Sequence, residues 1–420
     1  MAETLASNTP SPAPVKTRGR KPTPKIRGEE LYGATHVRSL EKHLAVLRAA
    51  HAHPNRTLFY DDVVVAYLMS FFTPTVKSLR TIEDASQTPQ MQADIKVKRI
   101  CRSTLSDANK VFDPALLEPI IEDLRARLPD LGRQDSQLAA LTRRILAVDA
   151  SLFSVTADVA WALQRRSADG TRKVAVRLNL KWATETGAIE CVSIGGAGES
   201  EAQAALQEIE PGCIYVMDRG YISYALLGRI LDAGSDFVLR LKTSINFEAH
   251  KDLPLSDADR AAGVISDRLG YLVGSQRSTP PGAMLREIIL LDPNDPDAKP
   301  VRLLTNLLDV SATVIGAVYR RRWQIELFFR WLKVHAHFEH LISHSRNGVT
   351  IGFYVAVIGV LLIYVQTQRP VSKYAYVMLG MVASGQATMD DILPILRERE
   401  RQCELARLQK ARKKAEKAGK

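Results

Sequence analysis

Residues 318–333 constrain this chain more than any other segment. Four polar side chains return to nearly the same side of an α-helix, because a helix turns by about 100° per residue. They fall within an arc of roughly 60° and are Tyr319, Arg322, Glu326 and Lys333. Arg330 joins them. The opposite side carries apolar residues that a core would bury: Ile325, Phe328, Trp331 and Leu332. The segment therefore predicts a helix throughout, with one carboxylate in a row of cations and a phenol.

A carboxylate among cations suits a site that handles a phosphodiester. The carboxylate can hold a metal ion, and the cations can bind phosphate oxygens. The same pattern is also typical of the solvated face of an ordinary amphipathic helix. Other segments of the chain favour the first interpretation.

Two short apolar runs each end in an aspartate, at Ile145–Asp149 and at Ile214–Asp218. Each run predicts a buried strand that stops at its aspartate, and catalytic groups collect where strands end at one edge of a sheet. Either aspartate alone also fits a helix N-cap or a turn. Together with Glu326 they predict a cluster of carboxylates for two Mg²⁺ ions, which sit about 3.5–4 Å apart in such sites.

From about Ile145 to Val365 the chain resembles the bacterial insertion-sequence DDE transposases that carry the YREK signature, of the insertion sequence four type. The resemblance rests on Asp149, on Asp218 with the following Arg-Gly-Tyr, and on the spacing of the four polar residues in the 318–333 segment. The family often has Asp-Gly-Thr at its first aspartate, where this chain has Asp-Ala-Ser.

The resemblance implies an α/β fold, with a ribonuclease-H-like catalytic core, an inserted β domain and an N-terminal helical DNA-binding region. It also implies a cut-and-paste DNA transposase in which Asp149, Asp218 and Glu326 are catalytic and bind two Mg²⁺ ions, with Mn²⁺ as a substitute. It implies DNA contacts by Tyr319, Arg322, Arg330, Lys333, Arg219, Tyr221, Arg240 and Lys242.

The partners that the resemblance implies are double-stranded DNA and a second copy of the chain. The DNA comprises the terminal inverted repeats of a transposon and the target, and the two copies would form a homodimer on it. The implied location is the bacterial cytoplasm, on the nucleoid.

The positive charge of the chain lies at its two ends. Of the net +11, residues 1–28 hold +5 and residues 397–420 hold +6, so the body between them is close to neutral. Basic tails on a neutral body favour a polyanionic partner such as nucleic acid, although solvated tails can also serve solubility alone.

Residues 31–141 predict helices, one of which starts at Arg102 with Ser103 as its cap. Arg102, Ser103 and Thr104 suit contacts with phosphates and base edges, as in a helix-turn-helix-like module that reads terminal repeats. The plain surface of a helical bundle is an equally good interpretation.

The remaining patterns complete the predicted organisation. Strand-like runs at 174–182 and 189–194 predict a hairpin through Gly187. The apolar run 351–365 predicts a core helix on the sheet, since it is shorter than the ~20 residues that span a bilayer. The predicted segments are a disordered basic tail (1–30), a helical repeat-binding domain (31–141), the first part of the core (142–235), an inserted β-rich domain (236–310), the second part of the core with C-terminal helices (311–395) and a basic tail (396–420).

Two other functions fit part of the pattern. One is a catalytically inactive, transposon-derived DNA-binding protein, although a binder gains nothing from carboxylates clustered near phosphate. The other is a structure-selective nuclease with the same core and no strand transfer.

Overall fold

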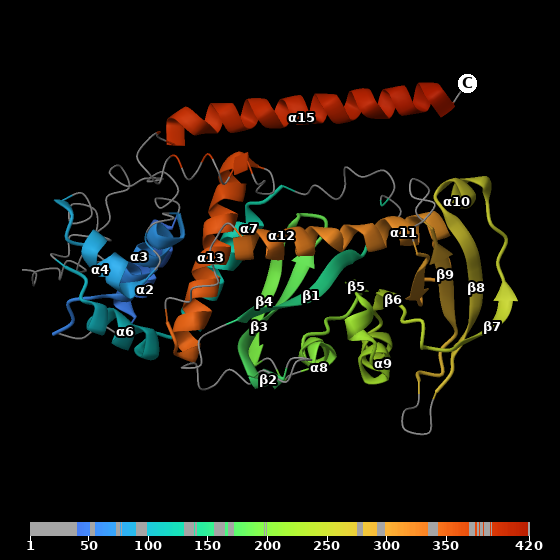
Figure 1. Ribbon diagram of the computed structural model, residues 1–420, viewed down its shortest axis with the longest axis horizontal. Coiled ribbons are helices and arrows are strands. Elements are labelled where there is room, and N and C mark those ends of the chain that lie inside the picture. Colours follow the sequence, from blue (N-terminus) through green and yellow to red (C-terminus); the bar gives the residue numbers. More distant parts are fainter. Residues whose placement is uncertain are drawn as a thin grey trace, which may run out of the picture.

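Figure 1 presents a computed structural model of the chain. It describes residues 40–50, 55–72, 76, 78–89, 99–129, 138, 141–154, 164–166, 172–196, 198, 200–274, 280–291, 299–334, 343–368, 374–375, 378, 381, 387 and 389–418. The predicted N-terminal tail, residues 1–30, lies outside the described residues.

Within the described residues, ten strands form one sheet in the order β2-β3-β1-β5-β6-β10-β9-β8-β7, and β4 pairs with β3. The pairs β1–β5 and β5–β6 are parallel, and the remaining pairs are antiparallel. The strands are β1 (Arg144–Ser154), β2 (Gln164–Arg166), β3 (Arg172–Ala183), β4 (Ala188–Gly196), β5 (Cys213–Met217), β6 (Asp236–Arg240), β7 (Phe247–Asp252), β8 (Val264–Leu272), β9 (Leu285–Leu290) and β10 (Val301–Thr305).

The described helices lie at the two faces and one end of this sheet (Figure 1). They are α2 (Glu41–Ala49), α3 (Tyr60–Phe72), α4 (Leu79–Ala85), α6 (Arg102–Val111), η1 (Pro114–Leu117), α7 (Glu118–Ala126), α8 (Glu201–Leu206), η3 (Arg219–Tyr221), α9 (Tyr224–Asp232), α10 (Asp257–Ala261), α11 (Ala312–Arg321), α12 (Trp323–Val334), α13 (Arg346–Thr367) and α15 (Met389–Ala418). The chain is a mixed α/β protein, as predicted.

Several strands form where the sequence predicted them. β3 and β4 are joined by a turn in which Gly187 has a φ of 65°, a backbone conformation that costs glycine little. The predicted hairpin is therefore confirmed. The predicted β-rich segment 236–310 does contain strands, but β6 and β10 continue the sheet that holds β1 and β5, so this segment is not a separate sheet.

The two faces of the sheet are covered by different helices. Leu146 and Tyr215 share a hydrophobic cluster with α9, whereas Ile145 and Ile214 share one with α11. Side chains alternate between the faces of a strand, so the register of β1 and β5 decides which residues meet which helices.

The N-terminal helices share one core with the C-terminal half of the chain. Buried side chains of α2, α3, α6 and α7 pack in the same cluster as those of α12, α13 and the strands β1, β3 and β4. α13 lies between these helices and the sheet (Figure 1) and contacts α3, α6, α7 and β4. The predicted core helix is therefore confirmed, but it packs on the N-terminal helices as well as on the sheet.

α13 is also the one described helix that is long and apolar enough to cross a membrane. Of its most apolar 18-residue window, within Arg346–Val365, 83% is buried inside the protein. This burial fits a core helix, which passes the same test of length and composition.

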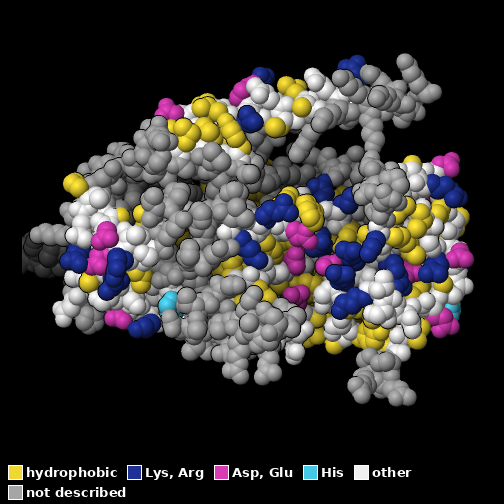
Figure 2. All heavy atoms as spheres, in the orientation of Figure 1, with side chains coloured by type: hydrophobic (Ala, Val, Ile, Leu, Met, Phe, Trp, Pro, Cys, Tyr) yellow, Lys and Arg dark blue, Asp and Glu magenta, His cyan; other side chains and the backbone are white. Residues whose placement is uncertain are grey.

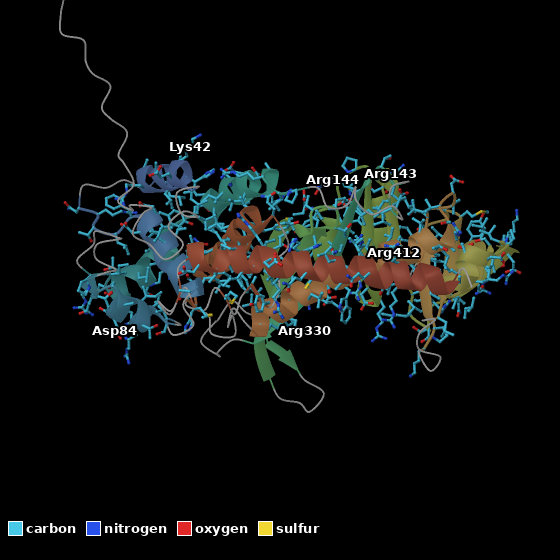
Figure 3. The ribbon with its side chains drawn as sticks, turned by 90° about the horizontal axis from the view of Figure 1, so that it is seen from above. Lys42, Asp84, Arg143, Arg144, Arg330 and Arg412 are labelled. Atoms are coloured by element: carbon cyan, nitrogen blue, oxygen red, sulfur yellow. The ribbon has the colours of Figure 1, made fainter. Side chains whose placement is uncertain are left out.

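α6 and α15 differ from their predicted ends. The N-cap of α6 is Cys101 without a side-chain hydrogen bond, so Ser103 lies inside the helix and is not its cap. α15 spans Met389–Ala418, so the predicted boundary of the basic tail at 395/396 falls inside one helix. Figures 1 and 3 show α15 extended lengthwise across the molecule.

A buried charged cluster in the N-terminal helices makes stability depend on pH. Burial and the neighbouring Asp62 raise the pKa of Asp61, and Arg48 lowers it. Together they give a pKa of about 6. The folded protein therefore holds this proton more tightly than the unfolded chain, whose Asp pKa is about 3.9. The stabilisation is complete below pH 4 and is lost as the pH rises to about 6.

We expect Asp61→Asn to abolish this pH dependence. The difference in free energy of unfolding between wild type and variant should change by about 2–3 kcal/mol between pH 4 and pH 7. Urea unfolding at several pH values measures it, with the exposed Asp107→Asn as the control for loss of one charge. A difference that stays constant with pH would contradict the expectation.

Candidate active site

Two neighbouring parallel strands bring the aspartates together. Val148 of β1 lies opposite Met217 of β5, so Asp149 and Asp218 come next on the two chains. By the alternation along each strand they face the same side as Ile145 and Ile214, which is the side covered by α11. The backbone of Asp218 is extended, so the alternation holds beyond the last residue of β5.

Asp149 does not end its strand, contrary to the prediction. β1 continues to Ser154, because the antiparallel ladder with β3 extends as far as Ser154 opposite Ala175. Asp218 does follow the last residue of β5 directly. One aspartate thus lies at the middle of a long strand beside the end of a shorter one.

The helix over residues 318–333 is interrupted at Arg322. α11 ends at Arg321 and α12 begins at Trp323. The N–H of Arg322 donates to the carbonyl of Tyr319, and the N–H of Ile325 donates to the carbonyl of Arg322, both at 3.1 Å. These bonds span three residues, so one tight turn joins two nearly continuous helices.

The predicted polar row of this segment faces the two aspartates. The Tyr319 hydroxyl donates to Asp218 Oδ1 at 3.4 Å. Arg322 donates from one nitrogen to Asp149 Oδ2 at 3.4 Å and from another to Glu326 Oε1 at 2.7 Å. The structure therefore brings Asp149, Asp218 and Glu326 together through the phenol and the guanidinium.

Packing on the opposite side holds α12 in place. Ile325, Phe328 and Leu332 are buried as predicted, and each contributes about 1.5–3 kcal/mol when fully removed from water. The indole N–H of Trp182 on β3 donates to Gln324 at 3.2 Å. The Lys333 ammonium lies 5.2 Å from the ring centroid of Phe153 on β1. These contacts fix both ends of α12 over β1 and β3.

Burial has the largest effect on the ionisation of Asp149. Burial raises the pKa of Asp149 to about 6, although the N–H of Ala150 and the guanidinium of Arg322 lower it. Glu326 and Glu201 raise it. Burial also raises the pKa of Tyr319. Burial lowers the pKa of Arg322, but Tyr319, Glu326 and Asp149 outweigh this effect and raise it above its usual value.

The other predicted DNA-binding residues are not brought together with these carboxylates by any hydrogen bond or ion pair among the described residues. Arg219, Lys242, Arg102, Ser103 and Thr104 are exposed, and Arg240 is half-buried and acts electrostatically on Tyr319. Figure 2 shows Lys and Arg side chains gathered around a few acidic ones in the middle of the face over α11 and α12.

Two predicted DNA contacts have a different setting. Tyr221 is 1% exposed, so it belongs to the core in this structure and does not reach a DNA surface. Arg330 is exposed and its guanidinium lies 6.0 Å from the ring centroid of Trp323. In Figure 3 it lies on the opposite side of the molecule from Arg143 and Arg144.

The donor chemistry of the site fits Mg²⁺, although no ready-made metal cluster is present among the described residues. Mg²⁺ prefers a few carboxylate oxygens and completes its coordination with water and phosphate oxygens. The side chain that links Asp149 to Glu326 here is the cation Arg322. A further cation beside the buried Asp149 would lower its raised pKa.

The sequence also matches a known protein family over the segment that forms this site. The family model described as "Transposase DDE domain" matches residues 140–362, more than half of the chain. The chain belongs to the DDE transposase family. The match begins just before β1 and extends into α13, so it covers Asp149, Asp218 and Glu326 with Tyr319 and Arg322.

Named relatives come from several bacteria. Putative transposase y4zB of Sinorhizobium fredii is 28% identical over 155 residues, 37% of this chain and 43% of the relative. The probable transposase of insertion sequence element IS5377 from Geobacillus stearothermophilus is 29% identical over 184 residues, 42% of this chain and 47% of the relative. The chain thus covers less than half the length of these two transposases.

A longer match has lower identity. The putative transposase of insertion sequence element IS4SA from Synechocystis is 25% identical over 298 residues, 68% of this chain and 78% of the relative. Among solved structures, a piggyBac transposase synaptic complex with hairpin DNA matches with a TM-score of 0.37 and 11% identity, over 91% of this chain and 85% of that one. A likeness this weak carries no structural argument.

Sequence reasoning missed one carboxylate at this site, Glu201. It acts on the charge of Asp149 although it lies 52 positions away, at the start of α8. An acidic residue in the first turn of a helix is ordinary, so the sequence around Glu201 contained no signal that would set it apart.

Proposed function

We propose that this DDE transposase family member is a DNA transposase with a ribonuclease-H-like core and a Mg²⁺-dependent cut-and-paste mechanism. Its substrates would be the terminal inverted repeats of a transposon and the target DNA, and it would act as a homodimer on DNA at the bacterial nucleoid. The observation that carries the proposal is the convergence of Asp149, Asp218 and Glu326 on one edge of the sheet, linked by Arg322 and Tyr319.

The reaction has two steps, a hydrolysis of one phosphodiester and a transfer of the resulting 3′-OH to another. Water attacks the phosphorus at the transposon end, the bond to the 3′ oxygen breaks, and a free 3′-OH and a 5′-phosphate result. The 3′-OH then attacks a phosphodiester of the target, so a new donor–target bond forms and a target 3′-OH leaves. Bound Mg²⁺ supplies activation of the attacking oxygen and stabilisation of the leaving one.

The side chains of the chain supply the rest. Asp149, Asp218 and Glu326 would hold the two metal ions, and Mn²⁺ would substitute for Mg²⁺. Arg322 and Lys333 would neutralise phosphate charge, and the hydroxyl of Tyr319 would hydrogen-bond a phosphate oxygen. Arg322 suits this role because its guanidinium offers several donors in one plane, two of which already contact carboxylates.

We also propose DNA contacts for predicted residues outside the carboxylate cluster. The exposed cations Arg219, Lys242 and Arg330 would bind the backbone of the duplex, together with the half-buried Arg240. The start of α6, with Arg102, Ser103 and Thr104, would read the terminal repeat. Phosphate contacts give affinity that falls steeply with salt, whereas base contacts give sequence preference.

A cleavage and strand-transfer assay with Mg²⁺ tests the proposal. The substrate is the DNA that flanks the gene in its source genome, and the variant is Asp218→Asn. We expect cuts at repeat ends and joined donor–target products from wild type, and neither from Asp218→Asn. The exposed Asp232→Asn on α9 is the matched control and should behave as wild type.

The same assay separates the rival functions. Cuts without joined products would identify a nuclease, and binding to the repeats without any cut by wild type would identify an inactive DNA-binding protein. Either result would overturn the transposase proposal.

A further inference from the structure

Glu201 reaches the catalytic edge of the sheet from the face opposite to α12. A Cβ built on Gly220 would lie 2.8 Å from Glu201 Oε2, so this carboxylate lies against the loop two residues after Asp218. α8, which begins with Glu201, also contacts β1, β3 and η3. The pairing of β5 with β1 ends at Met217 and Val148, so Asp149 is the first residue of β1 without a partner from β5.

The charges of carboxylates from two helices therefore act on Asp149. Glu326 from α12 and Glu201 from α8 both raise its pKa, and Arg322 offsets part of this repulsion. Carboxylates gathered around a buried carboxylate repel one another unless cations lie among them. Arg322 contacts Asp149 and Glu326, and no contact of Arg322 with Glu201 occurs among the described residues.

A buried hydroxyl beside these groups lacks a partner. Tyr221 is 1% exposed, and its hydroxyl makes no hydrogen bond within the described residues. The charges that act most strongly on it are those of Asp149 and then Glu201. A buried hydroxyl almost always has a partner, so this orphan indicates a water molecule or a hydrated ion next to it.

We propose that Glu201 is a fourth carboxylate of the metal centre and holds, together with Asp149, a hydrated divalent cation. A water molecule bound to this cation would form a hydrogen bond with the Tyr221 hydroxyl. The ion would be Mg²⁺, which keeps several waters when proteins bind it. The inference rests on the proposed function for the presence of a divalent ion. It adds a ligand and a positioning residue that the three predicted carboxylates do not include.

Gly220 is part of the same arrangement. A methyl group there would push the carboxylate of Glu201, which is the far end of a flexible side chain, while the backbone stays in place. Gly220→Ala therefore displaces Glu201 without removing any charge. It tests the position of the carboxylate independently of its presence.

The experiment measures Mn²⁺ binding to the full chain without DNA. The electron paramagnetic resonance signal of free Mn²⁺ reports how much of the ion is unbound. We expect Glu201→Gln to weaken Mn²⁺ affinity by about tenfold, and Gly220→Ala to weaken it by a smaller factor. Asp232→Asn removes an exposed carboxylate and should leave the affinity unchanged. The melting temperature without metal should not fall in Glu201→Gln, because the change removes a repulsion.

A second readout isolates Tyr221. Saturating Mn²⁺ should raise the melting temperature of wild type more than that of Tyr221→Phe, which lacks the hydroxyl. Equal metal-induced shifts would overturn the role of Tyr221.

The possible results separate this inference from the proposed function. If Asp149→Asn loses Mn²⁺ binding while Glu201→Gln and Gly220→Ala bind as wild type does, the fourth ligand is wrong and the metal centre stands. If wild type binds no Mn²⁺, both are overturned. If Glu201→Gln does not fold, Gly220→Ala alone decides.

Discussion

We expect Glu326→Gln to leave binding to transposon ends intact and to lower the rate of strand cleavage by at least about 10³-fold. Glutamine has nearly the same shape and can still accept a hydrogen bond from Arg322, so α12 keeps its place. It carries no charge, however, and a neutral amide oxygen is a poor ligand for Mg²⁺ compared with a carboxylate. Loss of a negative charge near phosphate also favours DNA binding, which should be unchanged or tighter.

Single-turnover cleavage of an end-labelled repeat, together with a gel-shift titration at fixed salt, measures both effects. Glu248→Gln is the matched control, because Glu248 is exposed on β7, the last strand of the sheet order. It should cleave at the wild-type rate. Cleavage by Glu326→Gln within tenfold of wild type would remove Glu326 from the metal centre, whatever the result for the two aspartates.

The largest effect on stability should come from Arg48→Met. Arg48 on α2 lies 2.7 Å from Asp61 Oδ2 and 3.0 Å from Asp62 Oδ1, and both aspartates are completely buried. It also stacks on Phe59, 4.7 Å from the ring centroid. Methionine fills much of the same volume but leaves two buried carboxylates without their cation. Breaking a buried ion pair in this way costs about 3–5 kcal/mol.

The same residues provide a stringent control. Asp61→Asn on its own removes one of the two buried charges, so the double variant Arg48→Met with Asp61→Asn should recover part of the lost stability. Urea unfolding of wild type, both single variants and the double variant gives the coupling energy. A loss below about 1 kcal/mol in Arg48→Met, the range of exposed ion pairs, would show that this cluster is solvated.

These helices matter for the active site because of the shared core. The cluster that buries the side chains of α2 and α3 also contains Ile325 and Phe328 of α12, the helix that carries Glu326. Loosening the N-terminal helices therefore removes packing from the helix that positions the third carboxylate. α13 joins these parts of the core, because it contacts α3, α6 and β4.

Much of the candidate site could be predicted because its pattern is local. The side of α12 that faces the aspartates follows from a helix of about 3.6 residues per turn. Which side of the sheet Asp149 and Asp218 occupy follows from the alternation along β1 and β5. The turn at Gly187 follows from the tolerance of glycine for a positive φ. Each of these properties depends on neighbours in the sequence, so each could be inferred from the sequence.

Other features depend on residues that are distant in the sequence. Asp149 lies mid-strand because β3 extends the ladder beyond it, and Tyr221 is buried because α8 and α9 cover its face. The charge of Glu201 acts on Asp149 because the tertiary structure packs α8 against β1 and β3.

The sequence by itself determined the mixed α/β class, the polar face of the 318–333 helices and the two aspartates, because periodicity within a segment reports which side is buried. The tertiary structure alone decided the tight turn at Arg322, the placement of α13 among the N-terminal helices and the approach of Glu201. The physical reason is that burial and charge interactions act between segments far apart in the chain, and their geometry is set only when the segments pack together.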